Sequence, residues 1–433
     1  MVLLTSWIVG GIFLATYLFI GIGKPHRVVV ALLGAIILAL YGAWAGFLPQ
    51  TEVPAAIDWD TLGLLVGMML LVEMLKHTRL FELLALRVIG LAQGSPVRLL
   101  WLLGGTTAIV SGFLDNVTTV LLLIPLTAES CRRLGVELQP FVLVEVFASN
   151  IGGAATLIGD PPNIMIGSAA GLSFLDFLLH MGPIVLVVLL GALFYLQWRF
   201  RAELRARAHW SGGEAILPSD RQALRRGLGV LALTLALFFV HDRLHLMPAT
   251  IAFLGAALLL LLSRDSPERV LREVDWSVLL FFGGLFVMVA AVERVGVIAQ
   301  LARGVLVLTG GNLYGIAGAI LVGGALISSV IDNVPLAAAM VPLITEISRA
   351  PELAVQLSGY AINPLWWALV LGVGLGGNGT LVGASANIVA AGALERLGRP
   401  VSFRQFFTIG FPLMLLTILL SGVLLYGLLS LRL

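Results

Sequence analysis

Charged residues are scarce in this sequence. Aspartate, glutamate, lysine and arginine make up 12% of its 433 residues, whereas a soluble domain has about 25%. Hydrophobic residues account for 59%, and the mean hydropathy is +1.03. This composition excludes a soluble globular protein and indicates an all-α, polytopic membrane protein.

Cysteine and lysine are almost absent as well. Cys131 is the single cysteine, so an internal disulfide framework and a thiolate metal cage are excluded. Lys24 and Lys76 are the two lysines, and the arginines form no basic run interleaved with aromatic residues, so we expect no nucleic-acid partner. We also expect no metal ion, no cofactor and no enzymatic activity.

Two polar clusters interrupt the hydrophobic sequence 217 positions apart. The first reads SGFLDNVTTVLLLIP and contains Asp115 and Asn116, and the second reads SSVIDNVPLAAAMVP and contains Asp332 and Asn333. A carboxylate or amide within a membrane span is costly, so its repeated presence is typical of a transport site. The alternative is that these residues only cap the helix that follows them.

A glycine-rich motif repeats in the same way. Residues 152–159, GGAATLIG, align with residues 376–383, GGNGTLVG, and Asn163 aligns with Asn387 at the same offset of 224. The chain is therefore predicted to consist of two halves built on one plan. We expect a first repeat at 1–210, a cytoplasmic linker at 211–223 and a second repeat at 224–433.

Two hydrophobic runs in the first half do not fit a simple span. At about 1.5 Å per residue the run 97–130 would form a helix of ~50 Å, beyond the ~30 Å hydrocarbon core, so it predicts a re-entrant hairpin centred on Asp115. The run 140–170 contains Pro161 and Pro162, which predict a broken helix. Together with 3–22, 28–48, 59–75 and 177–198, this gives about five crossings per half.

An odd number of crossings predicts that the two repeats are inverted relative to each other. With that topology, one side holds all the lysines and arginines except Arg243, Arg294, Arg303, Arg349 and Arg432. The positive-inside rule makes the richer side cytoplasmic. We therefore expect both termini outside the cell (inner) membrane and Cys131 at the cytoplasmic side. Segments 79–92 and 297–308 are predicted to be amphipathic helices at the interface.

The two hairpin tips and two helix breaks are expected to meet near the bilayer midplane and form the substrate site. No lysine or arginine lies at the centre of these four elements, so the site is expected to be acidic to neutral. The predicted substrate-binding residues are Asp115, Asn116, Thr118, Thr119, Thr156, Asn163, Asp332, Asn333, Asn378, Thr380, Ser385 and Asn387. The candidate proton carriers are Asp115, Asp332, Asp160 and Glu145.

On these motifs the sequence resembles the ion transporter superfamily, in the branch with the ArsB-type arsenite permease, the NhaD-type sodium/proton antiporter and the melanosomal P protein. The resemblance covers nearly the whole chain and is carried by SGFLDNVTTVLLLIP, NIGGAATLIGDPPNIMIGSAAGLSFLDF and SSVIDNVPLAAAMVPLI. It implies an inverted-repeat secondary transporter with an elevator-like motion. The sodium–dicarboxylate symporters of the superfamily differ, because their hairpin tips read Ser-Asn-Thr where this chain has Asp-Asn-Val.

From this resemblance and the residues of the site we expect a proton-coupled efflux antiporter for arsenite or antimonite, carried as the neutral trihydroxide. A Na⁺/H⁺ antiporter of the NhaD type is the alternative. A dicarboxylate transporter is less favoured, since aspartates would repel the solute, and so are a channel and an intramembrane aspartyl protease. The expected partners are arsenite, antimonite or Na⁺, protons, the lipid bilayer and, as a candidate homodimer, a second copy of the chain.

Overall fold

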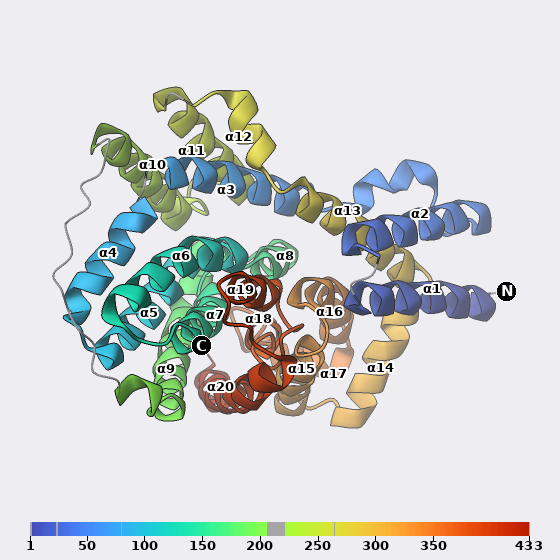
Figure 1. Ribbon diagram of the computed structural model, residues 1–433. Helices are drawn as coiled ribbons and strands as arrows, with labels where there is room; N and C mark the ends of the chain where they lie inside the picture. Colours follow the sequence, from blue (N-terminus) through green and yellow to red (C-terminus); the bar gives the residue numbers. More distant parts are fainter. Residues whose placement is uncertain (1, 23–24, 79, 206–220, 264, 433) are drawn as a thin grey trace.

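The computed structural model describes residues 2–22, 25–78, 80–205, 221–263 and 265–432 (Figure 1). These residues form helices, and they contain no β-strand. The predicted all-α class is confirmed. Most of the predicted linker 211–223 lies outside the described residues, and its last residues already belong to a helix that begins at Arg221.

The first half of the chain forms nine α-helices and three short 3-10 helices within the described residues. They are α1 (Val2–Ile22), α2 (Arg27–Ala45), η1 (Gln50–Glu52), η2 (Pro54–Ala56), α3 (Trp59–His77), α4 (Leu80–Ala92), α5 (Pro96–Ser111), α6 (Asn116–Leu134), α7 (Gln139–Gly153), α8 (Pro161–Ala170), α9 (Phe174–Arg199) and η3 (Glu203–Arg205).

The second half forms eleven α-helices within the described residues. They are α10 (Arg221–Val240), α11 (Pro248–Leu262), α12 (Pro267–Glu273), α13 (Trp276–Arg294), α14 (Val297–Thr309), α15 (Leu313–Ser328), α16 (Asn333–Ser348), α17 (Pro351–Leu357), α18 (Leu365–Gly376), α19 (Ser385–Arg396) and α20 (Phe403–Leu431).

The helices of the two halves follow the same order. The helices α3, α4, α5 and α6 begin 217 positions before α13, α14, α15 and α16, and α8 begins 224 positions before α19. Even the local chemistry repeats, because α9 and α20 both start with a capping box, formed by Ser173 with Asp176 and by Ser402 with Gln405. The helix α12 takes the place of η1 and η2 in the second half, and α17 is an addition to that half.

The predicted hairpin and the predicted broken helix are both present. The run 97–130 is split into α5 and α6 by a turn at 112–115, and 140–170 is split into α7 and α8 by a non-helical break at 154–160. The second half repeats both features, with a turn at 329–332 between α15 and α16 and a break at 377–384 between α18 and α19. Proline and polar residues in apolar sequence therefore located these interruptions correctly.

The two halves are interlocked. The helix α2 packs on α13 and α11 packs on α3, so each half contributes a helix to the other half's packing. Together with α1 and α10 these helices form a group that we call the scaffold. Inside the other group α5 packs on α7, α15 packs on α18, and α9 packs on α20. In Figure 1, α4 and α14 lie on opposite flanks of these central helices.

Glycines allow the hairpin helices to pack closely on the broken helices. A Cβ atom at Gly152 would lie 2.2 Å from the Ala108 carbonyl oxygen, and one at Gly376 would lie 2.6 Å from the Ala325 carbonyl oxygen. Both distances are far below van der Waals contact, so neither position accepts a larger residue without a backbone shift. The two glycines are equivalent in the repeats.

Among the described residues, six helices are long and apolar enough to cross a membrane, and counting each of two bent pairs as one span gives up to eight. The helices α5, α11, α16 and α18 are apolar but shorter. The crossing number and the inverted orientation therefore stay predictions. The two predicted amphipathic segments are helical, as α4 and α14, and α14 meets α15 at a bend of 116°.

Candidate functional site

The two hairpin tips and the two helix breaks meet in the interior. The helix α6, which follows the first tip, packs on α19 of the second half, and α16, which follows the second tip, packs on α8 of the first half. Each tip therefore faces the broken helix of the other repeat. The predicted convergence of these four elements is confirmed, although no local feature of the sequence indicated which tip faces which break.

Both tip aspartates cap a helix. The Asp115 side chain accepts a hydrogen bond from the Thr118 backbone N–H at 2.9 Å, and the Asp332 side chain accepts one from the Val334 N–H at 3.2 Å. Capping uses Oδ1 in each case and leaves Oδ2 available. Both aspartates therefore do cap a helix. Capping uses one oxygen of each carboxylate, and the other oxygen can make further contacts.

Equivalent threonines join each break to the hairpin turn of its own half. The Thr156 hydroxyl donates to the Gly112 carbonyl, and the Thr380 hydroxyl donates to the Ser329 carbonyl at 2.5 Å. Both threonines are buried. The unwound turns expose carbonyl groups that no helix satisfies, and these hydroxyls pair with them.

Equivalent asparagines satisfy the carbonyls of the breaks themselves. The Asn163 side-chain amide donates to the Gly153 and Thr156 carbonyls, and the Asn387 amide donates to the Gly377 and Thr380 carbonyls, each at 2.8 Å. The amide nitrogens of these predicted binding residues are thus engaged by the protein. Their contact with a solute stays a prediction.

A chain of asparagines crosses the site from the first tip to the second break. The Asn116 amide donates to Asn150 Oδ1 at 3.0 Å, and the Asn150 amide donates to Asn378 Oδ1 at 2.9 Å and to Asn387 Oδ1 at 3.0 Å. Asn150 was not among the predicted site residues. It is a buried amide within the apolar run 140–170, and the cost of burying a polar group there is the same signal that pointed to Asp115.

A hydrogen bond joins the second tip to the first break. The Asn333 amide donates to Asp160 Oδ2 at 2.8 Å, and the two residues are 4% and 3% exposed. Asp160 occupies the N-cap position of α8 but makes no capping hydrogen bond. Its equivalent in the second half is Ala384, so only the first break brings a carboxyl group to the opposite tip.

Arg27 reaches the second tip from outside the four elements. Its Nη1 lies 3.3 Å from Asp332 Oδ2 and 2.6 Å from Ser385 Oγ, and Ser385 Oγ donates to Asp332 Oδ2 at 2.5 Å. No basic residue lies at the turns and breaks themselves, but Arg27 of α2 brings a guanidinium to the second tip. Arg27 is the first residue of α2, and no local pattern links it to residue 332.

Two buried polar groups near the asparagine chain lack a partner among the described residues. They are the Thr119 hydroxyl in α6 and the Asn378 amide nitrogen in the second break. Buried polar groups are normally paired with protein or water. These two groups therefore keep hydrogen-bonding capacity that the described residues do not use.

A cavity of about 80 Å³ leads to the first tip. Asp115 and Thr118 line one part of it, and Glu73, Lys76 and Glu273 line another. A second cavity, of about 330 Å³, is lined by Asp60 and Leu64 near the other end of α3 and by Asp176 and His241. Ile164 of α8 lines both cavities. The helix α8 therefore lies between the two cavities, which are found toward opposite ends of α3.

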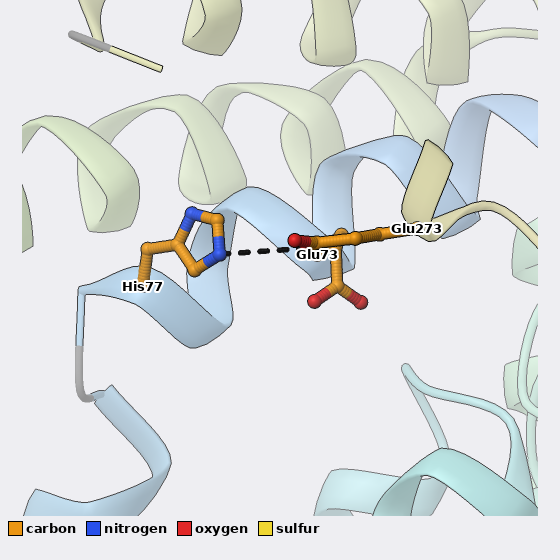
Figure 2. Close-up of side chains that lie close together, drawn as sticks. All are labelled: Glu73, His77 and Glu273. Carbon is orange, nitrogen blue, oxygen red and sulfur yellow. Dashed lines mark ion pairs between the residues drawn. The ribbon is translucent and has the colours of Figure 1, made fainter. Parts of the chain in front are cut away.

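A cluster of charged groups lies beside the first cavity (Figure 2). His77 and Glu73 project from α3 toward Glu273 of α12, with His77 Nε2 3.5 Å from Glu273 Oε2 and Lys76 Nζ 2.5 Å from Glu73 Oε2. A hydrogen bond from Glu73 lowers the pKa of Glu273, and the His77 charge adds to this effect. Ligand atoms of Glu73, His77 and Glu273 lie within 4.8 Å of one another, a spacing that a metal ion could bridge. No sequence motif had indicated this cluster.

Glu145 lies away from the tips. It is fully buried in α7, where Oε1 accepts a hydrogen bond from the Thr127 hydroxyl of α6 and Oε2 has no partner among the described residues. Thr127 is eleven residues beyond Asn116, or about 16 Å along the helix. The structure thus places three of the four predicted proton carriers at the tips and breaks, whereas Glu145 lies in α7 beside a later turn of α6.

The sequence is similar to several known transporters. A family model described as citrate transporter (CitMHS) matches residues 17–372. An uncharacterized transporter of Mycobacterium tuberculosis is 43% identical over 425 residues, which cover 96% of this chain and 97% of that protein. The P protein of Mus musculus is 34% identical over 477 residues, which cover 90% of this chain and 56% of the P protein. The predicted resemblance to the P protein is confirmed.

Two solved structures share the fold. The YdaH transporter of Alcanivorax borkumensis has a TM-score of 0.62 at 15% identity, with 88% of both chains covered. MtrF of Neisseria gonorrhoeae has a TM-score of 0.60 at 14% identity, with 97% of this chain and 94% of MtrF covered. Neither the family description nor these relatives name arsenite as a substrate. What the comparisons do show is that this chain belongs to the citrate transporter family and is a membrane transporter.

Proposed function

We propose that the chain is a proton-coupled secondary transporter of a small solute without net negative charge. The charge of the site carries this proposal. Asp115, Asp160 and Asp332 belong to the tips and the first break, and among the described residues Arg27 is the one basic side chain that contacts any of them. Three carboxyl groups against one guanidinium favour a cation or a neutral solute, and such groups serve as proton carriers in membranes.

For the solute itself we propose arsenite or antimonite, exported as the neutral trihydroxide in exchange for protons. A trihydroxide requires hydrogen-bond donors and acceptors and no counter-charge. The Asn378 amide and the Thr119 hydroxyl are buried without a partner among the described residues, and these groups could bind hydroxyls. The choice of this solute rests on the site residues and on the resemblance seen in the sequence.

Na⁺ is the second candidate solute, and one observation favours it. Asp332 Oδ2 and Ser385 Oγ already bind a cationic group, the Arg27 guanidinium. Carboxylate and hydroxyl oxygens are also suitable ligands for a small hard cation. A Na⁺ ion could therefore replace the guanidinium at this oxygen pair, and the chain would then exchange Na⁺ for protons.

Citrate, which the family description names, fits this site less well. A citrate trianion held a few ångströms from Asp115 and Asp160 would be repelled in the low-dielectric interior, with an energy that scales as ~332/(εr) kcal/mol for each pair of charges. Arg27 could offset one such repulsion only by leaving Asp332. We propose that the chain does not carry a free di- or tricarboxylate.

For the transport cycle we propose alternating access by an elevator-like motion. The hairpins and broken helices would move against the scaffold, with α4 and α14 as the connecting arms. The two cavities on opposite sides of Ile164 support this proposal, because they approach α8 from different ends of α3. We further propose ten crossings, inverted repeats, and both termini outside the cell (inner) membrane.

Proton flux in proteoliposomes tests the proposed function. The purified chain is reconstituted with a pH-sensitive dye inside, and arsenite, antimonite, Na⁺, succinate or citrate is added outside at a fixed pH gradient. We expect saturable, solute-dependent proton movement with arsenite and antimonite or with Na⁺, and none with succinate or citrate. The matched control is the Asp115→Asn/Asp332→Asn double variant.

The pattern of solutes decides between the candidates. Proton movement with arsenite but not Na⁺ supports the trihydroxide, and the reverse supports the Na⁺/H⁺ antiporter. Saturable citrate or succinate uptake, without proton movement by the other solutes, would overturn the charge argument.

A further inference from the structure

Two side chains connect α1 and α2 of the scaffold to the second hairpin. Arg27 of α2 contacts Asp332 and Ser385, and the Tyr17 hydroxyl of α1 donates to the Pro335 carbonyl of α16 at 2.9 Å. The helix α2 otherwise packs on α1, α13 and η1. These contacts therefore add to the packing of α13 on α16, through which the scaffold also touches the second hairpin, and they lie at the position where that hairpin turns.

The Asp332 carboxylate is fully occupied. Its Oδ1 caps α16 at the Val334 N–H, and its Oδ2 accepts hydrogen bonds from Ser385 and Arg27. The Arg27 guanidinium also lies over the Phe281 ring, 5.5 Å from its centroid. With side-chain exposures of 36% for Arg27 and 15% for Asp332, the ion pair is partly accessible, so another cation can compete for Oδ2.

The first hairpin has no comparable connection among the described residues. The position equivalent to Ser385 is Pro161, which has no hydroxyl group to share with Asp115. Asp115 and Pro161 line the first cavity, and the lysine of that cavity, Lys76, is paired with Glu73. The two tips therefore carry the same aspartate, but only the second tip is bound to the scaffold by a cationic side chain.

We propose that Arg27 is a coupling residue that acts as a tethered cation. It occupies Asp332 until a proton or the transported cation replaces it, and its release frees the second hairpin from the scaffold. This inference rests on the proposed proton-coupled transport. The ion pair holds the tip as long as the Asp332 carboxylate is charged. The second hairpin therefore moves only when that carboxylate is neutralised.

The charged groups around Asp332 are consistent with such an exchange. Arg27 faces it from α2, and Asp160 from the first break interacts electrostatically with both Asp332 and Asp115. When Arg27 leaves, the acidic groups remain without a basic partner among the described residues. A proton or a cation then has to compensate them, which links the release of the hairpin to ion binding.

Hydrogen–deuterium exchange of the solute-free protein in detergent tests the tether directly. Arg27→Gln removes the charge, and Arg294→Gln is the matched control, because Arg294 is a scaffold arginine in an ion pair with Glu52 and is 40% exposed. We expect Arg27→Gln to raise amide exchange at residues 329–336 at least fivefold and to leave residues 112–119 unchanged. Arg294→Gln should change neither segment, and Arg27→Lys should retain the protection.

Proton flux supplies the functional readout. In liposomes without solute, Arg27→Gln should leak protons at least tenfold faster than the wild type and Arg294→Gln, whereas Arg27→Lys should stay coupled. Unchanged exchange and unchanged coupling in Arg27→Gln would overturn the inference.

If Arg27→Gln does not fold, Asp332→Asn removes the other partner and must raise exchange at 329–336 in the same way. A wild type that moves no protons with any solute contradicts the proposed function but leaves the exchange result interpretable.

Discussion

The first hairpin tip opens onto a cavity, whereas the second is held by side chains of α1 and α2. Asp115 lines that cavity beside Thr118. Asp332 instead shares Oδ2 with Ser385 and Arg27. The same Asp-Asn pair therefore meets solvent-accessible space in one half and an ion pair in the other. Two copies of one motif can hold different roles when the residues around them differ.

The frame of the two tips is nevertheless the same. Thr156 and Thr380 join break to turn, and Asn163 and Asn387 close the breaks. The positions that differ include Asn150, Asp160 and Pro161, which are replaced in the second half by Gly374, Ala384 and Ser385. Residues that are identical in the two halves thus build the frame of the site. Residues that differ between the halves determine where its charges and hydrogen bonds lie.

The largest effect is expected from breaking the shared frame. Gly152→Ala and Gly376→Ala would place a methyl group against the Ala108 and Ala325 carbonyls, so each should destabilise the protein by about 1–3 kcal/mol or more. Thermal unfolding in detergent measures this. The controls are Gly105→Ala and Gly323→Ala, because a Cβ there meets no atom within 4 Å. Unchanged unfolding temperatures in the Gly152 and Gly376 variants would contradict the close approach.

The tip aspartates are next in expected effect. Asp115→Asn and Asp332→Asn should each reduce coupled transport at least 100-fold, since each removes a carboxyl group that carries charge in the site. Only Asp332→Asn should also free the second tip, as measured by amide exchange at residues 329–336. A double variant with wild-type pH dependence of transport would show that both aspartates only cap their helices.

A smaller effect is expected from replacing an acidic residue of the first half that has no acidic counterpart in the second half. Asp160→Ala copies Ala384 and leaves the Asn333 amide without its acceptor, so we expect a roughly tenfold slower rate and a shifted or lost pH dependence. Glu145→Gln should shift the pH profile with a smaller loss of rate, because Glu145 lies away from the tips. Glu346→Gln, at a half-buried position in α16 where the carboxylate pairs with Arg349, is the control. An unchanged profile in Asp160→Ala would exclude it as a proton carrier.

The smallest effect on transport is expected from cysteine substitutions, and labelling of the new cysteines tests whether the two halves are inverted in the membrane. Cys131 itself is only 1% exposed, so it is a poor reporter, and Cys131→Ser should leave transport within about twofold of wild type, as expected for a substitution outside the site. In that background Arg132→Cys and its equivalent Arg349→Cys place thiols at side chains that are 76% and 71% exposed.

An impermeant thiol reagent should label Arg132→Cys from the cytoplasmic side and Arg349→Cys from outside. Labelling of both positions from the same side would show that the repeats are parallel.

Much of the fold was predictable because the signals are local. Asp115 in the run 97–130 and Pro161 in the run 140–170 marked the turn and the break, since a polar group or a missing donor cannot continue an apolar helix at low cost. The segments that became α4 and α14 were found within one or two residues. Helix α12 and the cluster of Glu73, His77 and Glu273 were not predicted, because no periodicity or spacing marks them.

The candidate site was predictable in its residue types but not in its contacts. Asp115, Asn116, Asp332 and Asn333 were selected because polar groups in lipid are costly. Arg27 was missed because it lies in a loop-to-helix boundary where an arginine is ordinary. Its contact with Asp332 exists only because α2 packs beside α13 and its first residue points to the second tip.

The sequence by itself therefore determined the repeat, the two interruptions in each half and the polar residues that occupy them. These features follow from hydropathy, proline and helix capping, which act over a few residues. The tertiary structure decided which tip meets which break, that Asn150 links them, and that Arg27 rather than solvent pairs with Asp332. Such contacts join residues hundreds of positions apart, and only the close packing of whole helices fixes the distances between them.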